Sequence, residues 1–277
     1  MLEAIFVKPF ANVLFTLYNF LPGHDFGLAV IILTAMIRLA LWPVLAKQLK
    51  SQKKMQALQP EIARIRRDNA GDSQKMNAEM MELYKQKEIN PLASCLPLLI
   101  QFPFLIGLFV VFSHAASGVN GFEKLLYEPV KNLSFIKEIL ATPSLFQAKL
   151  FGIIDLSMKG NIFLAAVAGV TQFIQVKQIT PTADPNDPSA AANKVMVWLF
   201  PALTGYIGFT VVAALPLYWT VSNLISILQQ TVISNKEVDK MEEAQVVTKV
   251  RSGGKTDGDG SQKNLAKPKT SKKTKKK

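Results

Sequence analysis

The sequence predicts an all-α integral membrane protein with five transmembrane helices, a cytosolic helical hairpin and a disordered basic tail. Two observations predict this class. Apolar residues make up 49% of the 277 residues, and long stretches of the chain contain no charged side chain. Soluble domains rarely combine such an apolar fraction with long uncharged runs, so an ordinary soluble fold is excluded.

Four uncharged or nearly uncharged blocks approach the roughly 20 apolar residues that a helix needs to cross a bilayer. Residues 26–46 contain one charge and residues 92–113 none. Residues 161–176 contain none but would form only about 24 Å of helix. Residues 195–234 would form about 60 Å of uncharged helix, twice the bilayer core, so the block must fold back at Ala213–Pro216. The predicted spans are 26–46, 92–113, 161–176, 195–212 and 216–234.

Residues 1–21 are also apolar and allow two interpretations. A signal peptide would have a basic start and a small-residue cleavage pattern. This segment instead carries Glu3, lacks an Ala-x-Ala pattern and is interrupted early by Lys8-Pro9. We therefore expect residues 1–25 to be an extracytoplasmic segment with an amphipathic helix in the membrane interface.

The distribution of basic residues predicts the orientation of the chain. The loops 47–90 and 177–194 and the tail 235–277 together contain 25 Lys and Arg residues. The first 25 residues and the loop 114–160 contain six. Because basic residues accumulate on the cytoplasmic side, we expect the N-terminus outside and the C-terminus in the cytosol.

The cytosolic segment 47–90 is charged yet shows helical periodicity. Its apolar residues recur at steps of three and four on both sides of Asn69–Ser73, a stretch that favours turns and helix caps. We interpret it as a two-helix hairpin with a narrow apolar seam, in which Pro60 kinks or restarts the first helix. A solvated linker is the alternative. The seam comprises Met55, Leu58, Ile62, Ile65, Met76, Met80 and Leu83.

The tail 235–277 is predicted to be disordered and basic. From Ser252 onward it has almost no residue that could be buried. We expect its lysine-rich end to bind polyanions through counterion release, and ribosomal RNA and anionic lipid headgroups are the candidate partners. The alternative is a tail that keeps the chain soluble and has no specific partner. The lysines concerned are Lys267, Lys269, Lys272, Lys273, Lys275, Lys276 and Lys277.

Arg38 is the only formal charge within a predicted span. An arginine near the bilayer centre costs about 2.5–3.5 kcal/mol, so such residues usually face water or a protein partner. Its long side chain could instead reach the headgroups near Trp42-Pro43. Thr34 lies one helical turn away.

Other spans carry polar residues at helical spacing. The last span has a stripe that includes Trp219, Ser222 and Asn223, and it continues through Ser226, Gln229 and Gln230. Such stripes can hold helices together. Because the spans contain no carboxylate to pair with the arginine, we favour a hydrated cavity. Further polar members are Gln101 in the second span and Gln172 and Gln175 in the third.

Four segments together resemble the YidC/Oxa-type membrane protein insertases, over residues 1–234. The most specific is the run from Asn90 to Pro103, at the entry to the second span. The others are Thr34–Arg38, Met55–Pro60 and Leu217–Leu224, in the order and spacing of the family.

The resemblance implies a hydrophilic groove that is closed to the outside and open to cytosol and lipid. It assigns Arg38 as the groove arginine and Thr34 as its neighbour, places Trp219 near the substrate path, and matches Gln172 or Gln175 to a groove position. It also implies a bacterial plasma membrane protein whose partners are nascent membrane proteins, the ribosome and membrane lipids. Whether the chain works beside the Sec translocon stays open.

A small transporter or channel is the alternative function, although such folds usually show internal repeats, and none is found in this sequence. An intramembrane enzyme would need a nucleophile–base pair, a carboxylate dyad or a His-Glu-x-x-His motif. We predict no catalytic residue, no small-molecule substrate and no cofactor, and the absence of a phosphate-binding loop predicts no ATP hydrolysis. His24, His114 and Cys95 do not have metal-ligand spacing, so no metal site is predicted.

Overall fold

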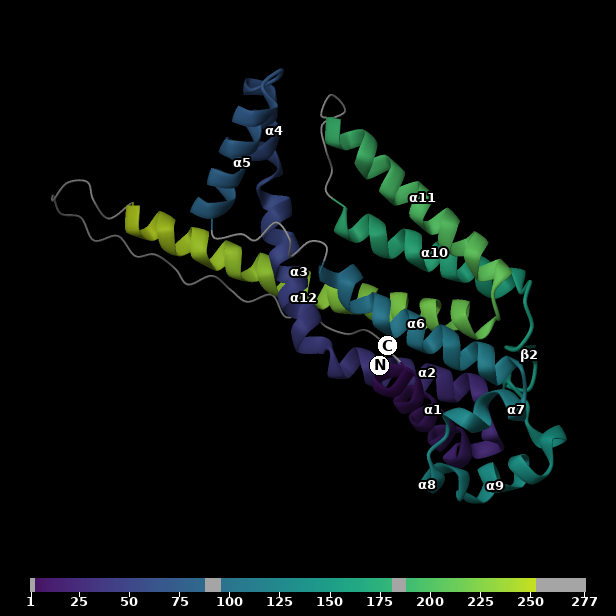
Figure 1. Cartoon of the computed structure of the whole chain (residues 1–277). Helices are drawn as coiled ribbons and strands as arrows, with labels where there is room; N and C mark the ends of the chain where they lie inside the picture. Colours follow the sequence, from purple (N-terminus) through teal and green to yellow (C-terminus); the bar gives the residue numbers. More distant parts are fainter. Residues whose placement is uncertain (1–2, 88–95, 181–187, 253–277) are drawn as a thin grey trace, which may run out of the picture. The chain divides into compact units, whose positions relative to one another are not determined.

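The computed structural model describes residues 3–87, 96–180 and 188–252, and these form helices with one two-residue β-ladder (Figure 1). The all-α class predicted from the sequence agrees with this architecture. The chain divides into two units, residues 1–234 and 235–277. The longer helices are α1 (Lys8–Phe20), α2 (Phe26–Ala40), α3 (Trp42–Ala57), α4 (Gln59–Asp68), α5 (Ser73–Gln86), α6 (Leu96–Ala116), α9 (Ser134–Ala141), α10 (Ile162–Ile179), α11 (Pro188–Thr210) and α12 (Ala214–Ser252). The short elements are α7 (Val119–Phe122), α8 (Glu128–Lys131), β1 (Lys149–Leu150), β2 (Ile154–Asp155), one π-turn at Glu3–Val7 and 3₁₀ turns at Pro22–His24, Glu123–Leu125 and Pro143–Leu145.

The predicted span 26–46 is not one straight helix. It breaks at Leu41, where α2 ends and α3 begins with a bend of 64°. Pro43 lies in the first turn of α3, where its missing N–H costs nothing but where it cannot continue the hydrogen bonds of α2.

Among the described residues, α10 alone is long and apolar enough to cross a membrane by itself. The bent pair α2 and α3 meets the same requirement when taken together. Residues 88–95, which include the start of the predicted second span, lie outside the described part of the chain. That the chain crosses the membrane five times therefore stays a prediction.

Helices α4 and α5 form a hairpin at the place that the periodicity indicated. Leu58, Ile62 and Leu83 make a small buried cluster between them. Asn69 closes the connection, because its amide donates to the Ile65 carbonyl at 2.9 Å and to Glu79 at 2.8 Å. Pro60 lies in the first turn of α4, so it restarts the helix rather than kinking it.

The largest core surrounds α1 and the segment between α6 and α10. Phe15 of α1 stacks on Phe122 with ring centroids 4.1 Å apart, and Phe26 and Phe146 complete the aromatic cluster. The buried face of α1 packs against this segment and against α2 and α6, and its location in the membrane interface stays a prediction.

Two predicted boundaries are corrected by α12. The turn after α11 comprises residues 211–213, and Pro216 already lies within α12. At its other end α12 continues to Ser252, so the prediction of disorder from residue 235 is wrong for residues 235–252. Ten of these 18 residues are Glu, Lys, Gln, Arg, Met or Ala, which have high helix propensity.

Candidate functional site

Arg38 lies in the last turn of α2 and is half-buried. Its Nε donates a hydrogen bond to Ser222 Oγ of α12 at 2.8 Å, and its Nη2 also donates to Ser222. A longer bond of 3.4 Å joins Nη2 to Gln101 Oε1 of α6. The structure therefore brings together Arg38, Gln101 and Ser222, which the sequence had placed on three different spans.

Tyr218 belongs to the same cluster, although the sequence reasoning did not select it. Gln101 donates a hydrogen bond through Nε2 to the Tyr218 hydroxyl, which is almost completely buried. The signal was present, because Tyr218 precedes Ser222 by four residues and so shares its helix face.

The hydrogen-bond partners of Arg38 among the described residues are neutral. Within the described residues no carboxylate forms an ion pair with it. A guanidinium has five N–H donors, and the two on Nη1 have no acceptor among the described side chains and carbonyls. The cluster thus orients a positive charge without neutralising it.

The polar stripe of α12 divides between two neighbours. Ser222 faces Arg38, whereas Asn223 donates to Thr171 Oγ1 of α10 at 3.3 Å. Gln172 and Gln175 bond to each other at 3.2 Å, and neither is bonded to Arg38 within the described residues. Asn223 therefore connects two helices.

Thr34 and Trp219 occupy positions that differ from the sequence interpretation in detail. Thr34 is buried, and its hydroxyl donates to the Val30 carbonyl of its own helix at 2.7 Å rather than to the guanidinium. Trp219 is partly buried and packs against the main apolar core. Their roles in a groove stay predictions.

Three buried glutamine side chains are unusual. Gln229 is 1% exposed, and its Nε2 has no partner among the described residues. Gln48 of α3 and Gln230 also have buried amide atoms without a partner there. Since buried polar groups are nearly always hydrogen-bonded, these amides require polar partners other than the described residues.

Comparison with known proteins identifies the family. Residues 16–241 match the family model described as 60Kd inner membrane protein. The chain belongs to this family. Two relatives are each named membrane protein insertase YidC, one from Nitratidesulfovibrio vulgaris (33% identical over 82% of this chain) and one from Francisella tularensis subsp. novicida (35% identical over 81%). The resemblance inferred from the motifs is thereby confirmed.

The match covers 38% and 36% of the lengths of these two relatives, so the chain spans little more than a third of each. Both relatives are named for membrane protein insertion. The seven lysines predicted to bind polyanions lie at 267–277, outside the described residues.

Proposed function

We propose that this chain is a membrane protein insertase of the bacterial plasma membrane. It moves hydrophobic segments of nascent proteins from the cytosol into the bilayer along a hydrophilic groove that contains Arg38, without nucleotide hydrolysis. The observation that carries this proposal is the guanidinium of Arg38, which is held by Ser222 and Gln101 and has no carboxylate partner among the described residues.

The energetics support a hydrated groove. A buried arginine without a counter-ion is costly in hydrocarbon, and neutral hydroxyl and amide partners recover only part of the lost hydration. The orphan amide atoms of Gln48 and Gln229 indicate the same need for polar contacts. Water in the groove would satisfy the free N–H groups of Arg38 and the amide of Gln229.

The groove would lower the barrier for a polar flank that precedes a hydrophobic segment. Moving polar groups through hydrocarbon is expensive, and a half-channel replaces part of that path. Arg38 would attract acidic flanks, while the hydrophobic effect would drive the apolar segment sideways into lipid. No step requires an external energy source.

The distribution of basic residues supports the orientation and the cytosolic partners that we propose. We place the N-terminus outside and the C-terminus in the cytosol, with residues 26–234 as the five-span core. The hairpin of α4 and α5 would then meet the nascent chain in the cytosol, and the lysines at 267–277 would bind ribosomal RNA or anionic lipid. The YidC names of the relatives support the choice of nascent membrane proteins as substrate.

Reconstituted vesicles test the proposal with two cargo proteins that differ only in an acidic or neutral extracytoplasmic flank. Arg38→Ala should reduce insertion of the acidic cargo more than that of the neutral one, because only the former gains from the charge. Arg38→Lys should retain part of the activity if charge suffices, and lose it if the forked guanidinium geometry is needed. Lys137→Ala, an exposed residue of α9, is the matched control for loss of one positive charge. Equal insertion of both cargoes by Arg38→Ala and the unaltered chain would refute the groove.

A further inference from the structure

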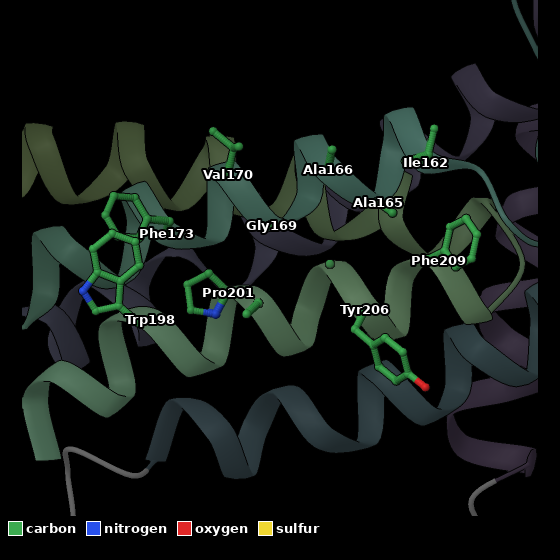
Figure 2. A pocket seen from close by; sticks show the side chains of 12 residues that line it. Ile162, Ala165, Ala166, Gly169, Val170, Phe173, Trp198, Pro201, Tyr206 and Phe209 are labelled. Atoms are coloured by element: carbon green, nitrogen blue, oxygen red, sulfur yellow. The ribbon is translucent and has the colours of Figure 1, made fainter.

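A second site lies between α10 and α11, where a groove of about 670 Å³ shares no lining residue with the cluster around Arg38 (Figure 2). Its floor is made by small residues. A Cβ on Gly169 would lie 3.2 Å from the Pro201 carbonyl oxygen and 3.6 Å from Gly205, so the two helices approach closely there. Larger side chains such as Val170 and Tyr206 rise on either side and form the walls.

One end of the groove combines aromatic rings with positive charge. Phe173 of α10 and Trp198 of α11 pack with ring centroids 5.0 Å apart, and Figure 2 shows them together at one end. Lys177 follows Phe173 by one helical turn, and its Nζ lies 5.8 Å from the ring centroid. Lys194 precedes Trp198 by one turn on the antiparallel helix, so both lysines belong to this end.

Seven of the twelve residues that line the groove are exposed in the isolated chain. Ile162 is 75% exposed, Trp198 67% and Tyr206 69%. Twelve residues line the groove, and none of them is charged. Because α10 is, within the described part of the chain, the one helix long and apolar enough to cross a membrane alone, hydrocarbon is the natural surrounding of this exposed apolar surface.

The length of the groove matches the thickness of the hydrocarbon layer of one leaflet. From Ile162 to Phe173 the groove follows α10 for about 16 Å at 1.5 Å per residue, close to half of a hydrocarbon core of about 30 Å. Neither Lys177 nor Lys194 forms an ion pair with a carboxylate within the described part of the chain, so both remain able to bind an external anion.

We propose that this groove binds a phospholipid with an anionic headgroup. One acyl chain lies between α10 and α11, the phosphate is held by Lys177 and Lys194, and the indole N–H of Trp198 lies at the polar boundary, as tryptophans at membrane interfaces do. In the proposed orientation this end faces the cytosolic leaflet. The site is additional to insertion, and its test does not depend on insertase activity.

Fluorescence quenching measures the occupancy directly. The sequence has three tryptophans, so a full-length chain with Trp42→Phe and Trp219→Phe retains Trp198 as its single indole. In phosphatidylcholine vesicles that contain some phosphatidylglycerol, brominated acyl chains are placed on either lipid in turn. We expect phosphatidylglycerol to associate with the Trp198 site about fivefold more strongly than phosphatidylcholine.

Two pairs of variants distinguish binding of the lipid headgroup from binding of the acyl chain. Lys177→Gln with Lys194→Gln should abolish the preference, whereas Lys75→Gln with Lys85→Gln, the same loss of charge on α5, should preserve it. Phenylalanines introduced at the two exposed alanines of the groove should reduce quenching by both lipids. These substitutions are Ala166→Phe and Ala202→Phe, with Val195→Phe and Leu203→Phe as exposed controls that do not line the groove.

Three results would overturn the proposal. Equal quenching by the two brominated lipids would show that the site does not select an anionic headgroup. An unchanged preference after the loss of Lys177 and Lys194 would show that these lysines do not bind the headgroup. A photocrosslinker at position 202 that captures a stalled nascent chain, or a second copy of this chain, in place of lipid would assign the groove to a protein partner.

Discussion

Ser222→Ala distinguishes a hydrated groove from a dry pocket. Ser222 Oγ accepts from both Nε and Nη2 of Arg38, so the substitution removes two of the three hydrogen bonds that the guanidinium makes to described residues and leaves the 3.4 Å contact with Gln101. Hydrogen bonds to a charged group contribute about 1.5–3 kcal/mol each when nothing replaces them. In a dry pocket the free energy of unfolding should therefore fall by about 3 kcal/mol or more.

Water changes this expectation. If the groove is hydrated, water rebinds the released N–H groups, and the loss of stability should be only about 0.5–1.5 kcal/mol. The proposed function requires this smaller value.

The measurement is equilibrium unfolding by titration with sodium dodecyl sulfate in mixed micelles, followed by far-ultraviolet circular dichroism. Ser226→Ala is the matched control, because that hydroxyl donates only to the Ser222 carbonyl of its own helix, at 2.9 Å. We expect it to change the unfolding free energy by about 0.5 kcal/mol or less. A loss of 3 kcal/mol for Ser222→Ala, against an unchanged control, would mean a dry guanidinium and would refute the groove.

Two further predictions concern Asn12 and the C-terminal lysines. Asn12 joins α1 to the Leu125 carbonyl at 2.9 Å and to the Tyr127 amide at 2.6 Å, so Asn12→Ala leaves both groups unpaired. It should lower the free energy of unfolding, measured by thermal unfolding, by about 2–4 kcal/mol. Thr16→Ala is the control because it breaks a hydrogen bond within α1 only, and equal melting temperatures for the two variants would contradict the assignment. Deleting 267–277 should weaken co-sedimentation with ribosomes and flatten its dependence on salt, whereas an unchanged salt profile would exclude the tail lysines from ribosome binding.

Periodicity predicted the helical elements well where a segment is long and its partner is near in sequence. The seam at Leu58, Ile62 and Leu83 was visible because both helices of the hairpin are neighbours in the chain. The break at Leu41 was missed although Pro43 signalled it, because the count of uncharged residues was given more weight than the backbone chemistry of proline.

The partners of polar side chains could not be predicted in the same way. Ser222 and Asn223 are adjacent, yet they are about 100° apart around the helix, and they bond to α2 and α10 respectively. Asn12 reaches a carbonyl 113 residues away. A hydrophobic pattern tells which residues are inside but not which helix lies opposite, so contacts of this kind require the packed structure.

The choice of partners around Arg38 bears on what the charge can do. A carboxylate in place of Ser222 would neutralise the guanidinium and occupy two of its donors as a bidentate pair. A hydroxyl and an amide fix the direction of the side chain at lower cost, and in the proposed function they leave the positive charge and the two N–H groups of Nη1 for an incoming acidic group. A carboxylate would also remain beside the guanidinium as a permanent counter-charge. Neutral partners are therefore the arrangement expected of a residue whose counter-charge arrives with the cargo and leaves again.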